Sequence, residues 1–170
     1  MNIRKYQDSD CLEDISRVYA LSWKSAYKGI VPQAYLDALP EGRWAPILAR
    51  NRSRLLLALD GEKIIGVSTY APARDITRIG WGEIISLYLL PDYYRQGTGT
   101  ALLHAAEEAL HTLGFADVYL WVLEDNHSAR AFYEKNGFRF SGDLLTAEIG
   151  GAPLRECRYV LAERPEFEEA

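Results

Sequence analysis

Residues 91–103 of the 170-residue chain read PDYYRQGTGTALL. An apolar stretch precedes them at residues 84–90, and apolar residues recur at helical spacing over residues 101–113. The pattern predicts a glycine-rich turn between a buried strand and an amphipathic helix. Gly97 and Gly99 allow backbone conformations that residues with a Cβ avoid, and they let a ligand approach the main chain.

The first turn of the predicted helix offers unpaired N–H groups and the positive end of its dipole, a combination that binds phosphate. Arg95 adds a positive charge, and Thr98 and Thr100 add hydroxyl donors. The usual ATP loop is excluded because no Gly-Lys-Ser/Thr follows. A dinucleotide fingerprint is excluded because Leu102 stands where the third glycine should fall. The stretch favours another phosphate-bearing ligand, and the alternative is an ordinary strand-to-helix connection.

The composition is that of an ordinary globular domain, with 48% hydrophobic and 25% charged residues. A net charge of −5 and a pI near 5.3 argue against nucleic-acid binding and would suit a cationic partner. No stretch looks able to cross a membrane and the N-terminus lacks a signal core, so a cytoplasmic location is predicted. Cys11 and Cys157 match no metal spacing and are expected to be reduced, buried thiols.

Periodicity along the rest of the chain predicts a mixed α+β domain with one central sheet. Strands are expected at residues 3–6, 55–59, 63–71, 83–90, 118–123, 138–141, 144–149 and 154–161. Helices are expected over residues 12–27, 32–39, 43–50, 98–113 and 126–136, the first capped by one of Asp8, Ser9 and Asp10. The strands at 84–90 and 118–123 are joined through a helix, so they are predicted to be parallel neighbours.

A second motif, NHSARAFYEKNGF, occupies residues 126–138. It resembles the acetyl-CoA-binding half-motif of the Gcn5-related N-acetyltransferase (GNAT) family, Asn-x-x-Ala-x-x-Phe-Tyr-x-x-x-Gly-Phe, at every fixed position. The first stretch resembles the same family's pyrophosphate motif, Gln/Arg-x-x-Gly-x-Gly/Ala. Gly97 and Gly99 match it, whereas Tyr94 stands where Gln or Arg is usual. Either Arg95 or Gln96 would then supply the polar contact.

The resemblance implies one N-acetyltransferase domain over residues 1–170, with acceptor-side helices in 1–50, an acetyl-CoA-binding core in 51–161 and an acidic tail in 162–170. It implies a twisted, mostly antiparallel sheet with one splayed parallel strand pair, flanked by helices. The expected reaction transfers acetyl from acetyl-CoA to a primary amine by direct attack in a ternary complex, without a metal. A small-molecule amine is favoured. The alternatives are a protein N-terminus or lysine, and a non-catalytic acetyl-CoA-binding module. A homodimer is also expected, because family members often dimerise.

Two residues carry the expected chemistry. Tyr133 matches the family tyrosine that reaches the CoA sulfur, and it is the candidate acid; the alternative is a core tyrosine beside Phe132. Glu83 is the candidate base, because some family members place a glutamate fourteen positions before Gly97. At a strand end in a cleft its pKa could be raised. The alternative is a solvated glutamate at a strand end.

The resemblance also assigns binding residues. The expected cofactor-binding set is Leu87, Tyr88, Leu89, Arg95, Gln96, Gly97, Thr98, Gly99, Thr100, Asn126 and Tyr133. The expected acceptor-binding set is Trp23, Tyr27 and Glu83, with Tyr35 and Trp81 as further candidate walls. For Asn126 the alternative is helix capping alone, and for Trp23 and Tyr27 it is a place in the core.

Overall fold

The computed structural model describes residues 1–162, so the predicted acidic tail lies outside the described residues from residue 163 onward. The strands are β1 (Asn2–Lys5), β2 (Leu55–Asp60), β3 (Lys63–Pro72), β4 (Gly82–Leu89), β5 (Val118–Leu123), β6 (Arg139–Ile149) and β7 (Ala152–Leu161). The helices are α1 (Leu12–Ala26), α2 (Gln33–Asp37), α3 (Ala45–Arg50), α4 (Thr98–Thr112) and α5 (His127–Lys135). Short 3₁₀ turns lie at η1 (Arg52–Arg54), η2 (Ile76–Arg78) and η3 (Pro91–Tyr93).

All seven strands form one sheet in the order β1-β2-β3-β4-β5-β7-β6. Every neighbouring pair is antiparallel except β4 and β5, which run parallel. That pair is in register only at Gly82–Val118 and Glu83–Tyr119, after which the two strands diverge. The predicted mixed α+β fold and its splayed parallel pair are confirmed.

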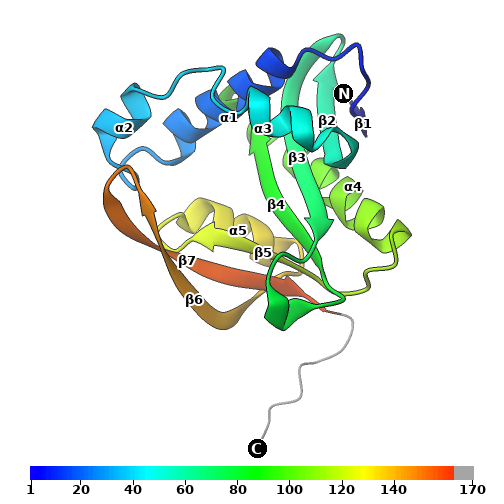
Figure 1. Ribbon diagram of the computed structural model, residues 1–170, viewed down its shortest axis with the longest axis vertical. Coiled ribbons are helices and arrows are strands. Elements are labelled where there is room, and N and C mark those ends of the chain that lie inside the picture. Colours follow the sequence, from blue (N-terminus) through cyan, green and yellow to red (C-terminus); the bar gives the residue numbers. More distant parts are fainter. Residues whose placement is uncertain (163–170) are drawn as a thin grey trace, which may run out of the picture.

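The two faces of the sheet are covered by different helices (Figure 1). On one face α4 and α5 bury apolar side chains such as Leu103, Leu110 and Tyr133 against the strands. On the other face α1 and α3 cover the N-terminal half of the sheet, where Ile15, Leu48 and Leu57 are buried together. A third apolar cluster joins the α1–α2 segment to the tip of the β6–β7 hairpin. The hairpin tip and α2 therefore meet, at the left in Figure 1.

A β-bulge interrupts β4. Thr69 of β3 pairs with Ser86 and Tyr70 pairs with Ile84, which leaves Ile85 between the two paired positions. One extra residue reverses the alternation of side chains beyond it. Ile84 and Leu89 consequently share the α4 face, although a regular strand would place them on opposite faces.

Two local expectations were wrong. Helix α1 has Cys11 at its N-cap without a side-chain cap. Asp10 is engaged elsewhere, because its carboxylate accepts hydrogen bonds from the Arg4 guanidinium and from the Gln7 backbone N–H at 2.7 Å. The cap position also leaves Cys11 exposed, whereas Cys157 is buried as expected.

Among residues 1–162, no helix has both the length and the apolar character that crossing a bilayer requires.

A glycine at the β3–β4 contact sets how closely these strands pack. A Cβ on Gly66 would collide with the Leu89 side chain and would lie 3.2 Å from the Ala58 Cβ and 3.3 Å from the Tyr88 carbonyl oxygen. We expect Gly66→Ala to lower the free energy of unfolding by about 1–3 kcal/mol through overpacking. Urea unfolding of Gly42→Ala provides the control, because its Cβ would meet no atom within 4 Å. Equal stability of the two variants would contradict this prediction.

Candidate active site

A cavity of about 910 Å³ occupies the gap between the diverging strands β4 and β5. Its walls come from the end of α1, from β4, from β5, from the turn before α4, from α5 and from one residue of β7. After Glu83 the two strands no longer pair with each other, and the facing edges of their backbones border this gap. Unpaired N–H and C=O groups at such an edge can bind an extended ligand.

The glycine-rich turn forms one end of the cavity. Arg95 has a positive φ of 60° and Gly97, the N-cap of α4, has a φ of 83°. The 15-residue helix α4 begins directly after this left-handed pair, and its first N–H groups have no intrahelical acceptor, as at the start of any helix. Free N–H groups at a helix start and a neighbouring arginine are the donors that anion sites commonly use.

Only some of the predicted cofactor-binding residues in this turn border the cavity. Four of them border it: Arg95, Gly97, Gly99 and Thr100. Thr98 is buried and Gln96 donates its side-chain N–H to the Asp92 carbonyl oxygen at 2.8 Å, and neither borders the cavity. Tyr94, which departs from the family motif, does border it.

The rest of the predicted set lines the middle of the cavity. Leu87, Tyr88 and Leu89 do so from β4 and Asn126 from the start of α5. The Asn126 Oδ1 also accepts a hydrogen bond from the Ala129 N–H at 3.2 Å, as the capping interpretation predicted. Capping and a position on the cavity wall are therefore compatible in this residue.

Tyr133 reaches the cavity from α5. Its ring packs edge-on against Phe132 and Phe138, with centroids 5.2 and 5.9 Å away, and the residue is 9% exposed. Among residues 1–162 its hydroxyl has no hydrogen-bond partner, although it borders the cavity. Burial, with a smaller effect of Tyr88, raises the pKa of Tyr133 well above its usual value, so the hydroxyl keeps its proton at neutral pH.

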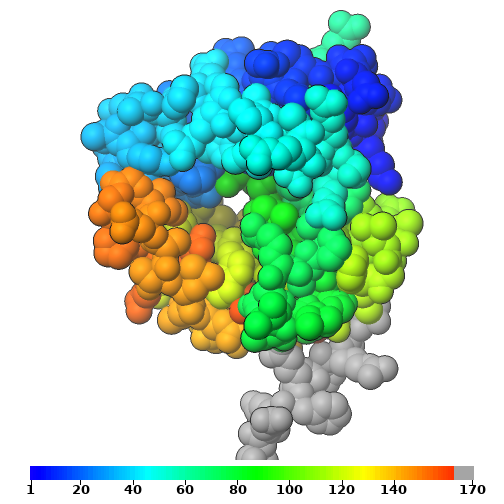
Figure 2. All heavy atoms as spheres, in the orientation of Figure 1, coloured from blue at the N-terminus to red at the C-terminus, as the bar shows by residue number. Residues whose placement is uncertain are grey.

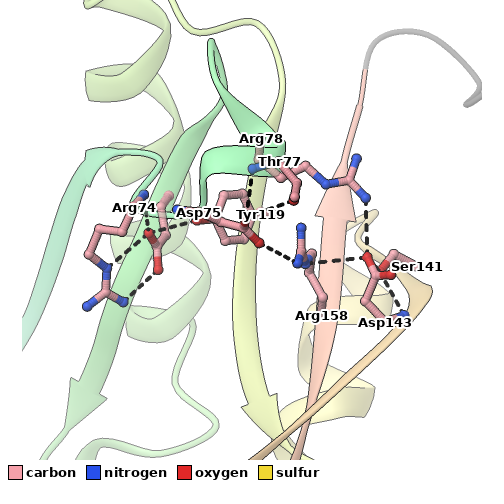
Figure 3. A network of polar contacts seen from close by, with 9 residues as sticks. Arg74, Asp75, Thr77, Arg78, Tyr119, Ser141, Asp143 and Arg158 are labelled. Carbon is pink, nitrogen blue, oxygen red and sulfur yellow. Dashed lines mark hydrogen bonds and ion pairs between the residues drawn. The ribbon is translucent and has the colours of Figure 1, made fainter.

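Glu83 differs from the expectation. It is 2% exposed and does not border the cavity. Arg74 holds its carboxylate through the side chain at 2.6 and 3.1 Å and through the backbone N–H at 3.1 Å, and the Tyr119 hydroxyl donates at 2.9 Å (Figure 3). Burial alone would raise the pKa of Glu83, but the Arg74 and Tyr119 interactions together lower it. The expected raised pKa was therefore wrong.

The polar network continues across the sheet beyond Glu83 (Figure 3). The buried Arg158 of β7 contacts Asp75 at 2.6 Å and Asp143 at 3.4 Å. Its guanidinium also lies over the rings of Tyr119 and Trp121, at 5.2 and 4.7 Å from their centroids. These contacts tie β5, β7 and the β3–β4 loop together at the end where β4 and β5 are still paired.

Glu156 of β7 is the carboxylate that does border the cavity, and the sequence analysis missed it. Burial raises its pKa, and the nearby charge of Arg74 opposes that rise. A sequence signal existed. Cys157 and Tyr159 belong to the core beneath α4 and α5, and strand alternation therefore places Glu156 on the opposite face.

The predicted acceptor residues are separated by the fold. Tyr27 borders the cavity, whereas Trp23 packs behind it with ring centroids 4.8 Å apart. Tyr35 packs against the β6–β7 turn at Gly150, and Trp81 lies under Arg78 at 4.7 Å. Neither Tyr35 nor Trp81 borders the cavity.

Within residues 1–162, no group of three or more His, Cys, Asp or Glu side chains is arranged to hold a metal ion.

Comparison with known proteins gives consistent results. The model of the acetyltransferase (GNAT) family matches residues 15–138. An uncharacterised N-acetyltransferase of Bacillus subtilis is 31% identical over 150 residues, spanning 85% of this chain and 84% of the relative. A spermidine N(1)-acetyltransferase of Thermoplasma acidophilum is 28% identical over 148 residues, spanning 82% and 88%. The crystal structure of the PaiA N-acetyltransferase of T. acidophilum with coenzyme A superposes with a TM-score of 0.69 at 26% identity, covering 92% of this chain and 96% of that one.

Proposed function

The chain belongs to the acetyltransferase (GNAT) family and is an acetyl-CoA-dependent N-acetyltransferase, and we propose that it acetylates the primary amine of a small molecule by direct attack in a ternary complex. The observation that carries the proposal is the single cavity that joins an anion-binding turn, a free strand edge, the Tyr133 hydroxyl and the Glu156 carboxylate. In the domain division that this implies, residues 1–50 contribute to the acceptor side and residues 51–161 form the acetyl-CoA-binding core.

The residues present fit acetyl-CoA as co-substrate. The turn from Arg95 to Thr100 and the N-terminus of α4 would hold the pyrophosphate. The unpaired edge of β4 at residues 87–89 would bind the pantetheine arm and polarise the thioester carbonyl through backbone N–H groups. Asn126 would contact the same arm from the other wall. When bound, the co-substrate supplies an activated acetyl group.

Tyr133 is proposed to assist the departure of the CoA thiolate. Within residues 1–162 its hydroxyl has no hydrogen-bond partner, and it can donate to the sulfur as the C–S bond breaks. The raised pKa means that tyrosinate would be a much stronger base than a thiolate. The hydroxyl must therefore regain a proton from the attacking amine nitrogen in the same step, so Tyr133 acts as a relay.

The preference for a small acceptor follows from how the acceptor side is closed. The tip of the β6–β7 hairpin packs on α2 through Ile149, Leu154 and Tyr35. The space-filling view shows a hollow in this face, enclosed by the hairpin, the α1–α3 segment and the β3–β4 region (Figure 2). An enclosed opening admits a narrow amine more readily than a folded protein chain.

Free-thiol release from acetyl-CoA tests the proposal. The panel would hold spermidine, which the name of a relative suggests, together with lysine, tyramine and a peptide with a free N-terminal alanine. We expect release that depends on one of the small amines, with the acetylated amine identified by mass spectrometry. Acetylation of the peptide alone would contradict the small-acceptor proposal. Absence of release with every amine, in protein that binds acetyl-CoA, would favour a non-catalytic module.

A further inference from the structure

The acceptor side of the cavity contains a carboxylate that the sequence did not single out. Glu156 lies on β7, opposite Leu123 of β5 and Leu145 of β6. Its side chain is partly buried and borders the cavity. No group among residues 1–162 donates a hydrogen bond to it. A partly buried carboxylate without a donor is costly unless an external cation or donor satisfies it.

On the cavity side, the groups around Glu156 are aromatic. Tyr27 of α1 and Tyr88 of β4 each have a pKa raised chiefly by burial, with a contribution from Glu156. The charge of Arg74 opposes the effect of burial on the pKa of Glu156, but among residues 1–162 no cation lies within 4.0 Å of the Glu156 carboxylate. Neighbouring Glu124 and Arg155 pair with each other at 2.6 Å. Aromatic rings and one unpaired carboxylate form a site for an ammonium group.

Glu83 is poorly placed for the same task. Arg74 occupies both of its carboxylate oxygens, and the Tyr119 hydroxyl donates to one of them. Burial and the adjacent carboxylate raise the pKa of Tyr119 to about 12, so this donor keeps its proton. Protonation of Glu83 would weaken its ion pair with Arg74, and the residue lies outside the cavity wall.

We propose that Glu156, in place of Glu83, binds the ammonium group of the acceptor and takes its first proton. This inference rests on the proposed function. The neutral amine nitrogen then forms the bond to the thioester carbonyl carbon as the C–S bond breaks. The second proton of the acceptor nitrogen passes through the Tyr133 hydroxyl to the departing sulfur. Glu156 then releases the first proton to water. The reaction therefore consumes one ammonium ion and one acetyl-CoA, and it produces one amide, one CoA thiol and one proton.

The test compares the pH dependence of kcat/KM for the amine in wild type and Glu156→Gln. The amine would be the best acceptor among spermidine, lysine and tyramine. At pH 7 we expect a loss of about 100-fold or more, because general-base catalysis contributes about 10²- to 10⁴-fold. The loss should shrink toward pH 10, where the amine deprotonates without help. The KM for acetyl-CoA should change less than about twofold, since Glu156 does not contact the co-substrate in this proposal.

Three further variants make the result specific. Glu156→Asp should recover part of the rate, because it restores a carboxylate at a shorter reach. Glu148→Gln, on the exposed side of the same hairpin, should match wild type. Thermal unfolding of each variant shows whether it folds. Two outcomes would overturn the inference and leave the proposed function standing. One is a pH dependence of kcat/KM in Glu156→Gln that equals that of wild type. The other is that the pH-dependent loss of kcat/KM occurs in Glu83→Gln and not in Glu156→Gln. Absence of activity in wild type with all three amines would overturn both the inference and the proposed function.

Discussion

Replacing Tyr133 by phenylalanine is expected to lower kcat about 100-fold while acetyl-CoA binds as in wild type. The change deletes one hydroxyl that has no hydrogen-bond partner among residues 1–162 and borders the cavity. The phenyl ring keeps its packing on Phe132 and Phe138, so the free energy of unfolding should change little. The expected loss belongs to the step in which the C–S bond breaks, because only there does the sulfur need a proton donor.

Steady-state kinetics and calorimetric titration of acetyl-CoA separate chemistry from binding. Tyr93→Phe is a suitable control, because its hydroxyl bonds Asp60 at 3.0 Å and lies outside the cavity. Turnover equal to wild type in Tyr133→Phe would remove this residue from the relay. A change confined to the KM for acetyl-CoA would instead assign Tyr133 to binding.

Replacing Arg74 by methionine is expected to lower the free energy of unfolding by about 3 kcal/mol at pH 7. The substitution leaves the Glu83 carboxylate, 2% exposed, with only the Tyr119 hydroxyl and one backbone N–H as donors. Because the Arg74 side chain is itself 63% exposed, we take the lower end of the range for breaking a buried pair. Arg155→Met removes a more exposed pair with Glu124 and should cost less than about 1 kcal/mol.

The effect of Arg74→Met should depend on pH. In wild type the folded pKa of Glu83 lies below its unfolded value. Its stabilisation is therefore present above the unfolded pKa and is lost as pH falls through the folded one. Without Arg74, burial should raise the folded pKa above the unfolded value, so the variant regains stability as pH falls and Glu83 takes a proton. The difference between the two proteins should shrink from pH 7 toward pH 4.

Urea unfolding at pH 7, 5.5 and 4.5 measures this difference directly. Two results would show that Arg74 does not hold a buried carboxylate. One is a destabilisation no larger than that of Arg155→Met. The other is a deficit that stays constant over the whole pH range.

Local patterns were sufficient for the elements on either side of the site. The strand at residues 118–123 and the helix around Tyr133 have the predicted limits within one residue, because alternation, helical spacing and the Asn126 cap all act over a few neighbours. The parallel pairing of β4 and β5 also followed from their helical connection. The glycine turn before α4 was predicted because only glycine takes a φ of 83° without strain at Gly97.

The positions of the Glu83 and Glu156 carboxylates could not be predicted from the sequence and required the tertiary structure. The bulge at Ile85 reverses the faces of β4, and a strand period of two cannot show such a shift from sequence. Arg74 reaches Glu83 from a loop whose path depends on the pairing of β3 with β4. Local spacing could therefore identify Glu83 as a carboxylate at the start of a strand, but could not show that Arg74 and Tyr119 would bind it and lower its pKa.

By itself the sequence determined the family, the order of the elements, the glycine turn before α4 and the place of Tyr133 on its helix, since these depend on contacts between near neighbours in the chain. Only the tertiary structure decided which acidic side chain faces the cavity. Glu156 reaches the site because β7 inserts between β5 and β6, and Glu83 is withdrawn because β4 and β5 are still paired beside it. Burial and charge at these positions come from residues far apart in the chain, and they exist only once the sheet has assembled.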